Sequence, residues 1–310
     1  MSAKSRPGNA IAERTRRFDF GEEEPTSREY CQYSILENGQ YTLGLSTVPK
    51  LPSGAYNIEW TPQNGIVFKK RVIKGDEFLN LEESLSGNLF KEITQFWQKG
   101  PIFKKYGLLH RRGYLLYGPQ GSGKSSIISQ TVHELATREN GVSFICDQVG
   151  VMADALSSFR KVEPDRPAIC VFEDIDDIIE HQNEAVLLSM LDGETQIDKV
   201  INIATTNYPE KLEDRIIARP RRFDRVIKVD MPNSNLRRAY FKEKLNLGVE
   251  DLNKWTSDTE GLSFACLTEL VISVKCLDHD YDETLKTLRG ILKSKVSSKD
   301  DVSKPGFALS

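Results

Sequence analysis

The sequence is poor in the residues that would mark a disulfide-stapled, zinc-binding or membrane-spanning protein. Its 310 residues include five cysteines, an odd number with no Cys-X-X-Cys pair, and four scattered histidines. These counts favour a reduced, cytoplasmic protein without a zinc site. No apolar run reaches about 18 residues, so no transmembrane helix is expected. The basic stretch 1–17 lacks the apolar segment of a secretory signal, and an organelle transit peptide is the weaker alternative.

The chain also lacks a large excess of positive or negative charge. Lys and Arg number 42 against 45 Asp and Glu, a net charge of −3, which gives no argument for nucleic acid or an acidic membrane as the main partner. The 14 Phe, 10 Tyr and 3 Trp suffice for a packed core. At about 150 residues per domain, the length suggests about two domains.

The first part of the chain changes texture along its length. Residues 1–28 mix charged residues with Pro, Gly and Ser, and we expect a flexible arm. Runs rich in β-branched and aromatic residues, separated by Pro- and Gly-containing turns, then predict a small β-rich N-terminal domain over 29–80. The expected strands are 41–48, 55–60 and 66–73.

A linker helix is predicted over 81–105. One helical stripe, ended by Gly100-Pro101, carries its apolar residues: Leu89, Phe90, Ile93, Phe96 and Trp97. The stripe either bridges two domains or simply packs on the next one.

From Gly113 onward, apolar strands alternate with amphipathic helices, which predicts an α/β fold with a parallel P-loop sheet covered by helices on both faces. This core is assigned to 106–231. The expected strands are 113–117, 142–147, 169–173, 201–205 and 226–229. After Pro232 only helical patterns remain, so 232–293 should form an all-α lid and 294–310 a disordered tail.

A phosphate-binding loop follows the first of these strands and opens a helix. Its spacing is GxxxxGK[ST], in which glycines let backbone N–H groups converge on phosphate, Lys124 reaches the β- and γ-phosphates, and Ser125 holds Mg²⁺. The residues expected to bind ATP here are Gly118, Pro119, Gln120, Gly121, Ser122, Gly123, Lys124, Ser125 and Ser126.

Acidic and polar side chains end the neighbouring strands. Glu173 and Asp174 follow a buried strand, where one carboxylate can order Mg²⁺ through water and the next can polarise the attacking water. Asn207 ends the next strand and could orient that water, although Asn at a strand end is often a turn residue. Four arginines within 219–225 are either a solvated charge run or an arginine finger.

Taken in order, these motifs resemble the AAA family of ATPases over about 96–292, and within it the mitochondrial Rieske-protein translocase type with its bacterial and phage relatives. The shared marks are Arg111-Arg112-Gly113-Tyr114-Leu115-Leu116-Tyr117-Gly118-Pro119, the phosphate loop, the Glu173-Asp174 order, Leu191-Asp192-Gly193, Thr206-Asn207, the arginine turn and Gly261-Leu262-Ser263-Phe264-Ala265. The missing transmembrane helix argues against the membrane translocase itself.

The resemblance implies a homo-oligomeric ring, usually hexameric, in which ATP hydrolysis remodels or translocates a macromolecule. It assigns Glu173 to the metal side, Asp174 as catalytic base, Asn207 as sensor, and Arg219 and Arg222 as fingers. It also places Tyr106 and Gly107 in the adenine pocket.

Several residues depart from the family pattern. Asp174 is one methylene shorter than the usual base, so hydrolysis could be slow. Arg221 and Phe264 each replace a glycine, and no arginine lies near Ala265 to act as a lid sensor. The loop 147–152 lacks the aromatic residue with which unfoldases grip a chain, so threading is not expected.

Three functions fit these observations. A ring-forming ATPase that remodels a protein or protein complex comes first. A slow nucleotide-dependent assembly switch or scaffold is the alternative that the short base and the missing aromatic favour. A nucleic-acid motor or loader comes third, because the net charge argues against it.

Overall fold

The structure is a computed structural model that describes residues 32–35, 39–44, 48–72, 85–182, 184–192, 197–212 and 221–293. The predicted arm over 1–28 and tail over 294–310 lie outside the described residues. Arg219 also lies outside them.

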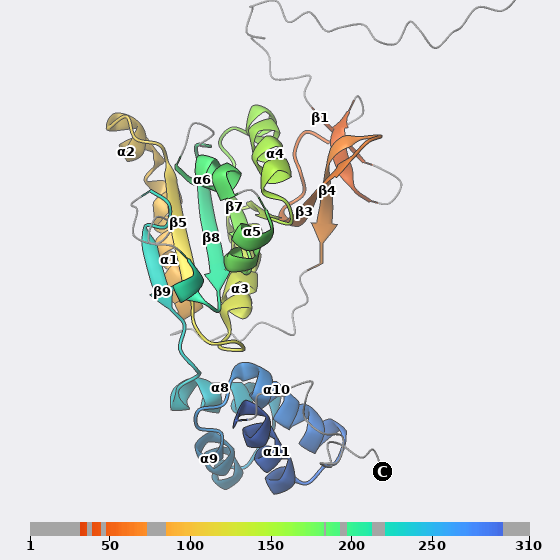
Figure 1. Cartoon of the computed structure of the whole chain (residues 1–310), viewed down its shortest axis with the longest axis vertical. Helices are drawn as coiled ribbons and strands as arrows, with labels where there is room; N and C mark the ends of the chain where they lie inside the picture. Colours follow the sequence, from red (N-terminus) through yellow and green to blue (C-terminus); the bar gives the residue numbers. More distant parts are fainter. Residues whose placement is uncertain are drawn as a thin grey trace, which may run out of the picture.

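Within the described residues, nine strands form one sheet in the order β1-β2-β4-β3-β6-β7-β8-β5-β9 (Figure 1). The strands from β3 to β9 in this order are parallel to one another, whereas β4 runs antiparallel to both β2 and β3. Their bounds are β1 Gln32–Ile35, β2 Tyr41–Gly44, β3 Gly54–Thr61, β4 Gly65–Arg71, β5 Arg111–Tyr117, β6 Val142–Ile145, β7 Ala168–Phe172, β8 Val200–Thr206 and β9 Arg225–Lys228.

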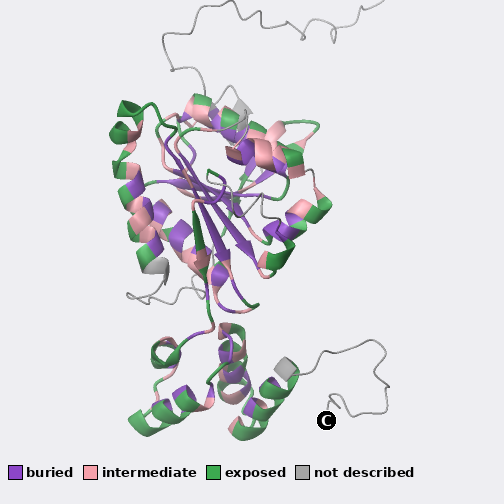
Figure 2. Ribbon diagram, turned by 60° about the vertical axis from the view of Figure 1, so that its left-hand side comes forward, coloured by how far each residue is buried: buried purple, intermediate pink, exposed green. Residues whose placement is uncertain are grey.

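Helices cover both faces of the parallel part, and this explains why β6, β7 and β8 are buried at every position (Figure 2). The α/β part contains α1 Leu85–Gln98, α2 Gly100–Lys105, α3 Lys124–Arg138, α4 Val149–Val162, α5 Ile175–His181, α6 Glu184–Asp192 and the short η3 Pro209–Lys211. The predicted α/β fold with a parallel sheet and helices on both faces is confirmed.

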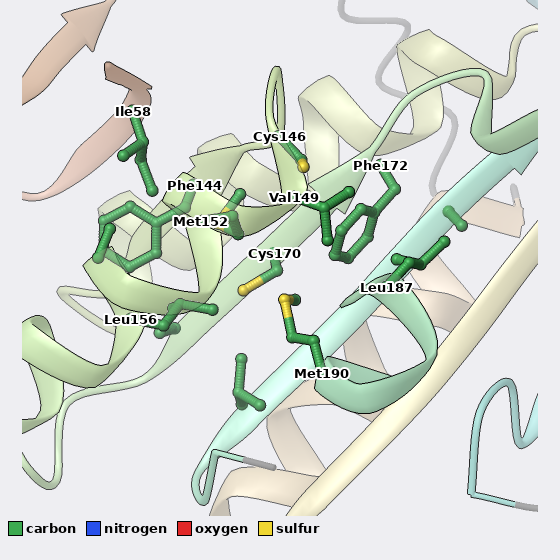
Figure 3. Close-up of a cluster of buried hydrophobic side chains, with 14 of the residues drawn as sticks. Ile58, Phe144, Cys146, Val149, Met152, Leu156, Cys170, Phe172, Leu187 and Met190 are labelled. Atoms are coloured by element: carbon green, nitrogen blue, oxygen red, sulfur yellow. The ribbon is translucent and has the colours of Figure 1, made fainter. Parts of the chain in front are cut away.

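Two apolar layers hold this part together. On one face, Met152 and Leu156 of α4 and Met190 of α6 pack on Phe144 and Cys170 of the sheet (Figure 3). On the other face, α1 and α3 pack on alternate residues of the same strands. The stripe predicted for the linker helix therefore packs on the α/β core. Its helix ends at Gln98, and Gly100-Pro101 begins α2 because proline is tolerated in a first helical turn.

The predicted N-terminal strands are present, but they extend the core sheet and do not form a sheet of their own. β3 pairs in parallel with β6 from Gly54↔Val142 to Asn57↔Ile145. An edge strand exposes unpaired backbone groups, and these strands cover the edge that β6 would otherwise present. The expectation of a separate β-rich unit is corrected accordingly.

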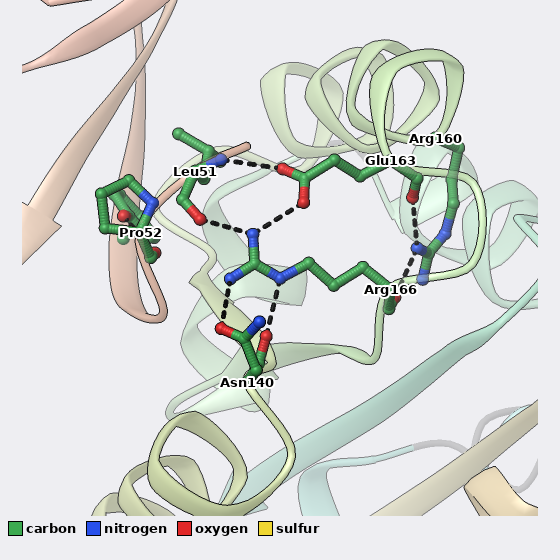
Figure 4. A network of polar contacts seen from close by, with 7 residues as sticks. Leu51, Pro52, Asn140, Arg160, Glu163 and Arg166 are labelled. Atoms are coloured by element: carbon green, nitrogen blue, oxygen red, sulfur yellow. Dashed lines mark hydrogen bonds and ion pairs between the residues drawn. The ribbon is translucent and has the colours of Figure 1, made fainter. Parts of the chain in front are cut away.

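A buried polar network fastens these strands to the end of α4 (Figure 4). The Glu163 carboxylate accepts a hydrogen bond from the backbone N–H of Leu51 at 2.9 Å and pairs with Arg166 at 2.7 Å. Arg166 also donates to the carbonyl oxygens of Leu51 and Asn140. Three segments far apart in the sequence therefore meet at one satisfied ion pair.

A separate helical domain follows β9 (Figure 1). It consists of α8 Ser234–Lys244, α9 Val249–Asp258, α10 Phe264–Val271, the π-helical η4 Ile272–Cys276 and α11 Tyr281–Lys293, around its own apolar cluster. The predicted all-α lid is present. Helix α9 has a weak apolar pattern in the sequence, because Leu252 and Trp255 are its only buried apolar residues. None of the helices described is both long and apolar enough to cross a membrane.

Candidate functional site

The phosphate loop lies between the end of β5 and the start of α3. Gly121 and Gly123 have φ of 75° and 103°, in the region that favours glycine. Gly123 precedes the first residue of α3 and offers no capping side chain, so the backbone N–H groups at this helix start are available to an anion.

Lys124 is buried at the first position of α3. Its ammonium donates to the carbonyl oxygens of Gly118 at 2.8 Å and Pro119 at 2.9 Å, and to Oδ1 of Asn207 at 2.7 Å. Burial lowers the pKa of Lys124, while Asp174 and Asp176 oppose that shift. The buried ammonium group of Lys124 is therefore held, with little water around it, at the place where a phosphate would bind.

Asp174 stands in a left-handed backbone conformation, with φ of 48°, directly after the Glu173 that follows β7. Its Oδ1 accepts a hydrogen bond from Nδ2 of Asn207 at 3.1 Å, and its backbone N–H donates to Oγ1 of Thr205 at 3.0 Å. Burial raises the pKa of Asp174, and the neighbouring Asp176 adds to the rise. Lys124, Asn207 and Asp174 thus form one connected row.

Glu173 points elsewhere. Its carboxylate lies 3.6 Å from a guanidinium nitrogen of Arg71, at the end of β4. Glu173 does not line the cavity described below, so in this structure Asp174 alone of the acidic pair faces it.

Two threonines of β8 support the row, and the sequence reading gave them no role. The Thr205 hydroxyl receives the backbone N–H of Asp174, and the Thr206 hydroxyl donates to Asp176 at 2.6 Å. Asp176 and both threonines are buried. Their signal in the sequence was only a pair of hydroxyl residues directly before Asn207, which is too common a pattern to single out.

A cavity of about 700 Å³ opens between this row and the lid. A volume of this size suits a nucleotide-sized ligand. One wall carries the phosphate loop, Asp174 and Asn207, and the other is a mostly apolar lid surface. The lining residues are Gln120, Gly121, Gly123, Lys124, Ser125, Ser126, Asp174, Thr205, Asn207, Tyr240, Lys244, Phe264, Ala265, Thr268, Val271 and Ile272.

The lid contacts the phosphate loop directly at the residue that departs from the family pattern. The backbone N–H of Phe264 donates to the carbonyl oxygen of Gly121 at 3.0 Å. The ring of Phe264 lies so close to Gly123 that a Cβ there would come within 3.1 Å of it. The glycines are therefore needed for the approach of the lid as well as for phosphate.

Tyr106 and Gly107 do not reach this cavity, and the expectation that they line an adenine pocket is wrong in this structure. They follow α2, before the first residue of β5, whereas the phosphate loop follows its last residue. Seven residues of extended strand span about 20 Å, so the two sites lie at opposite ends of β5. Tyr106 is instead exposed at the far edge.

The arginine turn lies at this far edge too, next to the start of β5. Gly113 and Asp224 exchange two hydrogen bonds, from Asp224 N–H to the Gly113 oxygen at 2.9 Å and from Gly113 N–H to Oδ2 of Asp224 at 2.8 Å. Arg222 is buried, with Nε 2.9 Å from Oδ2 of Asp192 at the end of α6. Arg221 is exposed at φ of 79°. The role of arginine finger stays a prediction for Arg222, and Arg219 lies outside the described residues.

The donors around the cavity fit magnesium. Ser125 and Asp174 line it, whereas Glu173, which directly precedes Asp174 after β7, is turned toward Arg71. Hard oxygen donors of this kind, few in number and completed by phosphate and water, are how Mg²⁺ is held in nucleotide sites.

A parallel sheet with a GxxxxGK[ST] loop at the carboxyl edge of one strand, and an acidic pair at the edge of another, defines a P-loop nucleoside triphosphatase. Residues 114–231 match the model of the ATPase family associated with various cellular activities, AAA. The chain therefore contains an AAA ATPase domain, the kind of domain that hydrolyses ATP, as the motifs had indicated.

The chain is also similar in sequence to several ATPases and to a chaperone. The proteasome-activating nucleotidase of Methanococcus maripaludis is 30% identical over 193 residues, 56% of this chain and 47% of that protein. The ATPase family gene 2 protein of Saccharomyces cerevisiae is 29% identical over 198 residues, 56% and 25% respectively. The probable mitochondrial chaperone bcs1 of Schizosaccharomyces pombe is 31% identical over 182 residues, 55% and 39%. The chain spans about half the length of these relatives or less.

Proposed function

We propose that this protein binds ATP in the cavity between the phosphate loop and the lid, hydrolyses it, and uses the cycle to remodel a protein or a protein complex. The observation that carries the proposal is the connected row of Lys124, Asn207 and Asp174 on one wall of that cavity. The AAA domain supports the ATPase chemistry, and the relatives named as a chaperone and as a proteasome-activating nucleotidase support the kind of substrate.

Each residue of the row has a distinct task in this proposal. Lys124 and the N–H groups of the phosphate loop hold the phosphates, with Gln120 and Ser126 beside them. Ser125 would hold Mg²⁺, which neutralises charge on the phosphates when bound, and Glu173 would join it only after turning away from Arg71. Asp174 accepts the proton of the attacking water, and Asn207 orients that water. Because Asn207 also accepts a hydrogen bond from Lys124, it links the base to the cation that holds the phosphates.

The arginine turn supports assembly into a ring. It adjoins Gly113, and about 17 Å of strand separates that residue from Gly118 at the phosphate loop. The turn therefore faces away from the site of its own chain, and its arginines can serve only the site of another copy. A head-to-tail contact of this kind closes into a ring when the rotation allows, and a hexamer is the expected size.

The segment 147–152, which follows β6, does not favour the threading of an extended chain. It carries no aromatic residue, and three contacts tie it down. Asp147 accepts hydrogen bonds from Asn57 at 3.2 Å and Gln182 at 2.8 Å, and Gln182 in turn accepts the N–H of Val149 at 3.0 Å. This favours either remodelling of folded partners or, as the second candidate function, a slow nucleotide-dependent switch. We propose no nucleic-acid partner, and a cytoplasmic location stays a prediction.

ATP turnover per subunit, measured over a range of protein concentrations together with native mass, tests the proposal. A specific activity that rises and then saturates as larger assemblies form supports a composite site in a ring. The Lys124→Ala variant should lose nucleotide binding, and Asp174→Asn should bind ATP without turnover. Tight binding with no turnover in the wild-type protein would favour the switch, and normal turnover in Asp174→Asn would remove Asp174 as the base.

A further inference from the structure

The backbone of Asp174 is held at both of its polar groups. Its N–H donates to Oγ1 of Thr205 at 3.0 Å, and its carbonyl oxygen accepts the N–H of Asp177 at 2.9 Å, in the first turn of α5. The residue has φ of 48°, a left-handed conformation that residues with a Cβ rarely adopt. Because both backbone groups have partners, the carboxylate is the group of Asp174 that is left to act in the cavity.

The carboxylate of Asp174 does not serve the helix that it precedes. Asp174 comes directly before Ile175, the first residue of α5, and its side chain makes no capping hydrogen bond to that helix. An aspartate at such a position ordinarily has an extended backbone and caps the helix with its side chain. Here Oδ1 accepts a hydrogen bond from Nδ2 of Asn207 at 3.1 Å instead, and the residue lines the cavity. The left-handed backbone therefore assigns this carboxylate to the site and not to the helix.

Thr205 holds this conformation from the neighbouring strand. It lies on β8, is 2% exposed, and its backbone pairs with β5 in the register Leu116↔Thr205. The side chain of a threonine has few rotamers because it branches at Cβ. The oxygen that accepts the Asp174 N–H is therefore fixed by the sheet, on a residue that lies 31 positions away in the sequence.

Thr206, the next residue along β8, has a different task. Its hydroxyl donates to Asp176 at 2.6 Å and accepts the N–H of Tyr208 at 2.9 Å. These contacts fasten α5 to the turn after β8, and neither Thr206 nor Asp176 is among the described residues that line the cavity. Of the two threonines, it is Thr205 that borders the cavity and contacts Asp174.

We propose that Thr205 is a positioning residue for ATP hydrolysis, whose hydroxyl holds the peptide of Asp174 so that the carboxylate stands at the attacking water. The inference rests on the proposed function, in which Asp174 is the base. An aspartate has one methylene less than a glutamate, so its reach depends more on where its backbone lies. A misplacement of about 1 Å costs about 10²-fold in rate. Lys124 is anchored separately, by carbonyl oxygens of the phosphate loop, so ATP binding should not depend on Thr205.

The first test removes the hydroxyl without changing the shape of the side chain. Thr205→Val should bind a fluorescent ATP analogue within about two-fold of the wild type, yet its kcat should fall by about 10²-fold with little change in KM. Thr205→Ser keeps the accepting oxygen and should turn over ATP at nearly the wild-type rate. The matched control is Thr256→Val in α9 of the lid. It also removes a buried hydroxyl, which donates to the carbonyl oxygen of Leu252 at 2.6 Å, and it should leave kcat unchanged.

Amide hydrogen exchange shows whether the hydroxyl acts through Asp174. The amide of Asp174 should exchange faster in Thr205→Val than in the wild type or in Thr256→Val, because its hydrogen bond is lost. Unchanged exchange at this amide, an ATP affinity that falls together with kcat, or a Thr205→Ser variant as slow as Thr205→Val overturns the inference.

A second variant and a second base substitution separate this inference from the proposed function. Thr205→Ala removes the same oxygen as Thr205→Val, so it should lose turnover to a similar degree even where the valine variant folds poorly. Normal turnover in either variant, beside an inactive Asp174→Asn, overturns this inference alone. Full turnover in Asp174→Asn would instead overturn the proposed role of Asp174, and this inference with it.

Discussion

The Nε atom of Arg222 lies 2.9 Å from Oδ2 of Asp192, and water reaches neither side chain appreciably. This pair connects the end of α6 to the turn before β9, two segments that are 30 residues apart in the sequence. It gives the turn a fixed position relative to the sheet. A buried ion pair does not by itself add much stability, but loss of one partner is expensive.

Replacing Arg222 with Met should therefore lower the free energy of unfolding by about 3–5 kcal/mol, because Asp192 stays buried without its arginine. Urea unfolding of the nucleotide-free protein measures this. The double variant Arg222→Met/Asp192→Leu should regain most of the loss, since it removes the stranded charge. A double variant as unstable as the single one would contradict this explanation.

The strain at Arg221 predicts an unusual order of two substitutions. With φ of 79°, Arg221→Gly should be more stable than Arg221→Ala by about 1 kcal/mol, because glycine alone enters this region without a penalty. At Arg225, inside a strand, alanine should be the more stable of the two. Thermal unfolding of the four variants compares both positions. The same order at both would show that position 221 is not strained.

Gly113 is the point where the turn touches the sheet, so a side chain there should displace it. A Cβ on Gly113 would lie 2.0 Å from the carbonyl oxygen of Arg222, which is backbone and cannot move aside. We expect Gly113→Ala to cost several kcal/mol, on the order of 3. Gly150 in α4 has open space around it, and Gly150→Ala should instead be neutral or stabilising by about 0.5 kcal/mol. Chemical denaturation of both variants provides the measurement.

Much of the site was readable from the sequence because its geometry is local. The spacing from Gly118 to Ser125 fixes a loop between a strand and a helix, and the acids and Asn207 end strands that must share one edge of a parallel sheet. Tyr106 was misplaced because the family resemblance alone assigned it to the adenine pocket, whereas a strand of about 20 Å separates it from the phosphate loop. The burial of Arg222 could not be foreseen, since its partner Asp192 is distant in sequence and only the folded turn aligns them.

The N-terminal strands show the same limit on a larger scale. Their runs of β-branched and aromatic residues predicted strands correctly, but no local pattern states that β3 will pair with β6. The Glu163–Arg166 pair and the N–H of Leu51 come from distant parts of the chain and join the segment before β3 to the residues after α4. Nonlocal pairing of buried polar groups of this kind has no signal in the local sequence.

This network predicts how the N-terminal strands detach. Arg166→Met leaves the Glu163 carboxylate, 2% exposed, without its cation, and the loss should be about 3 kcal/mol or more. Amide hydrogen exchange should accelerate first in β3 and β4, before α3 or β8 is affected. Lys199→Met removes a half-buried partner of the exposed Asp165 nearby and should change neither stability nor exchange appreciably. Uniform acceleration across the whole chain would show that Arg166 supports the core in general and not this junction.

The pH dependence of turnover should reveal the environment of Asp174. Burial and the neighbouring Asp176 and Asp177 raise the pKa of Asp174 above its ordinary value of 3.8, and Lys124 only partly offsets them. A general base works when deprotonated, so kcat/KM for ATP, which reports the free enzyme, should fall on acidification at a higher pH than an ordinary aspartate would allow. Asp176→Asn keeps an oxygen that can accept the hydrogen bond of Thr206 but removes the charge, and it should move this acid limb to lower pH. Asp154→Asn, exposed on α4, should leave the limb in place. An acid limb that does not move in Asp176→Asn would mean that a group other than Asp174 controls it.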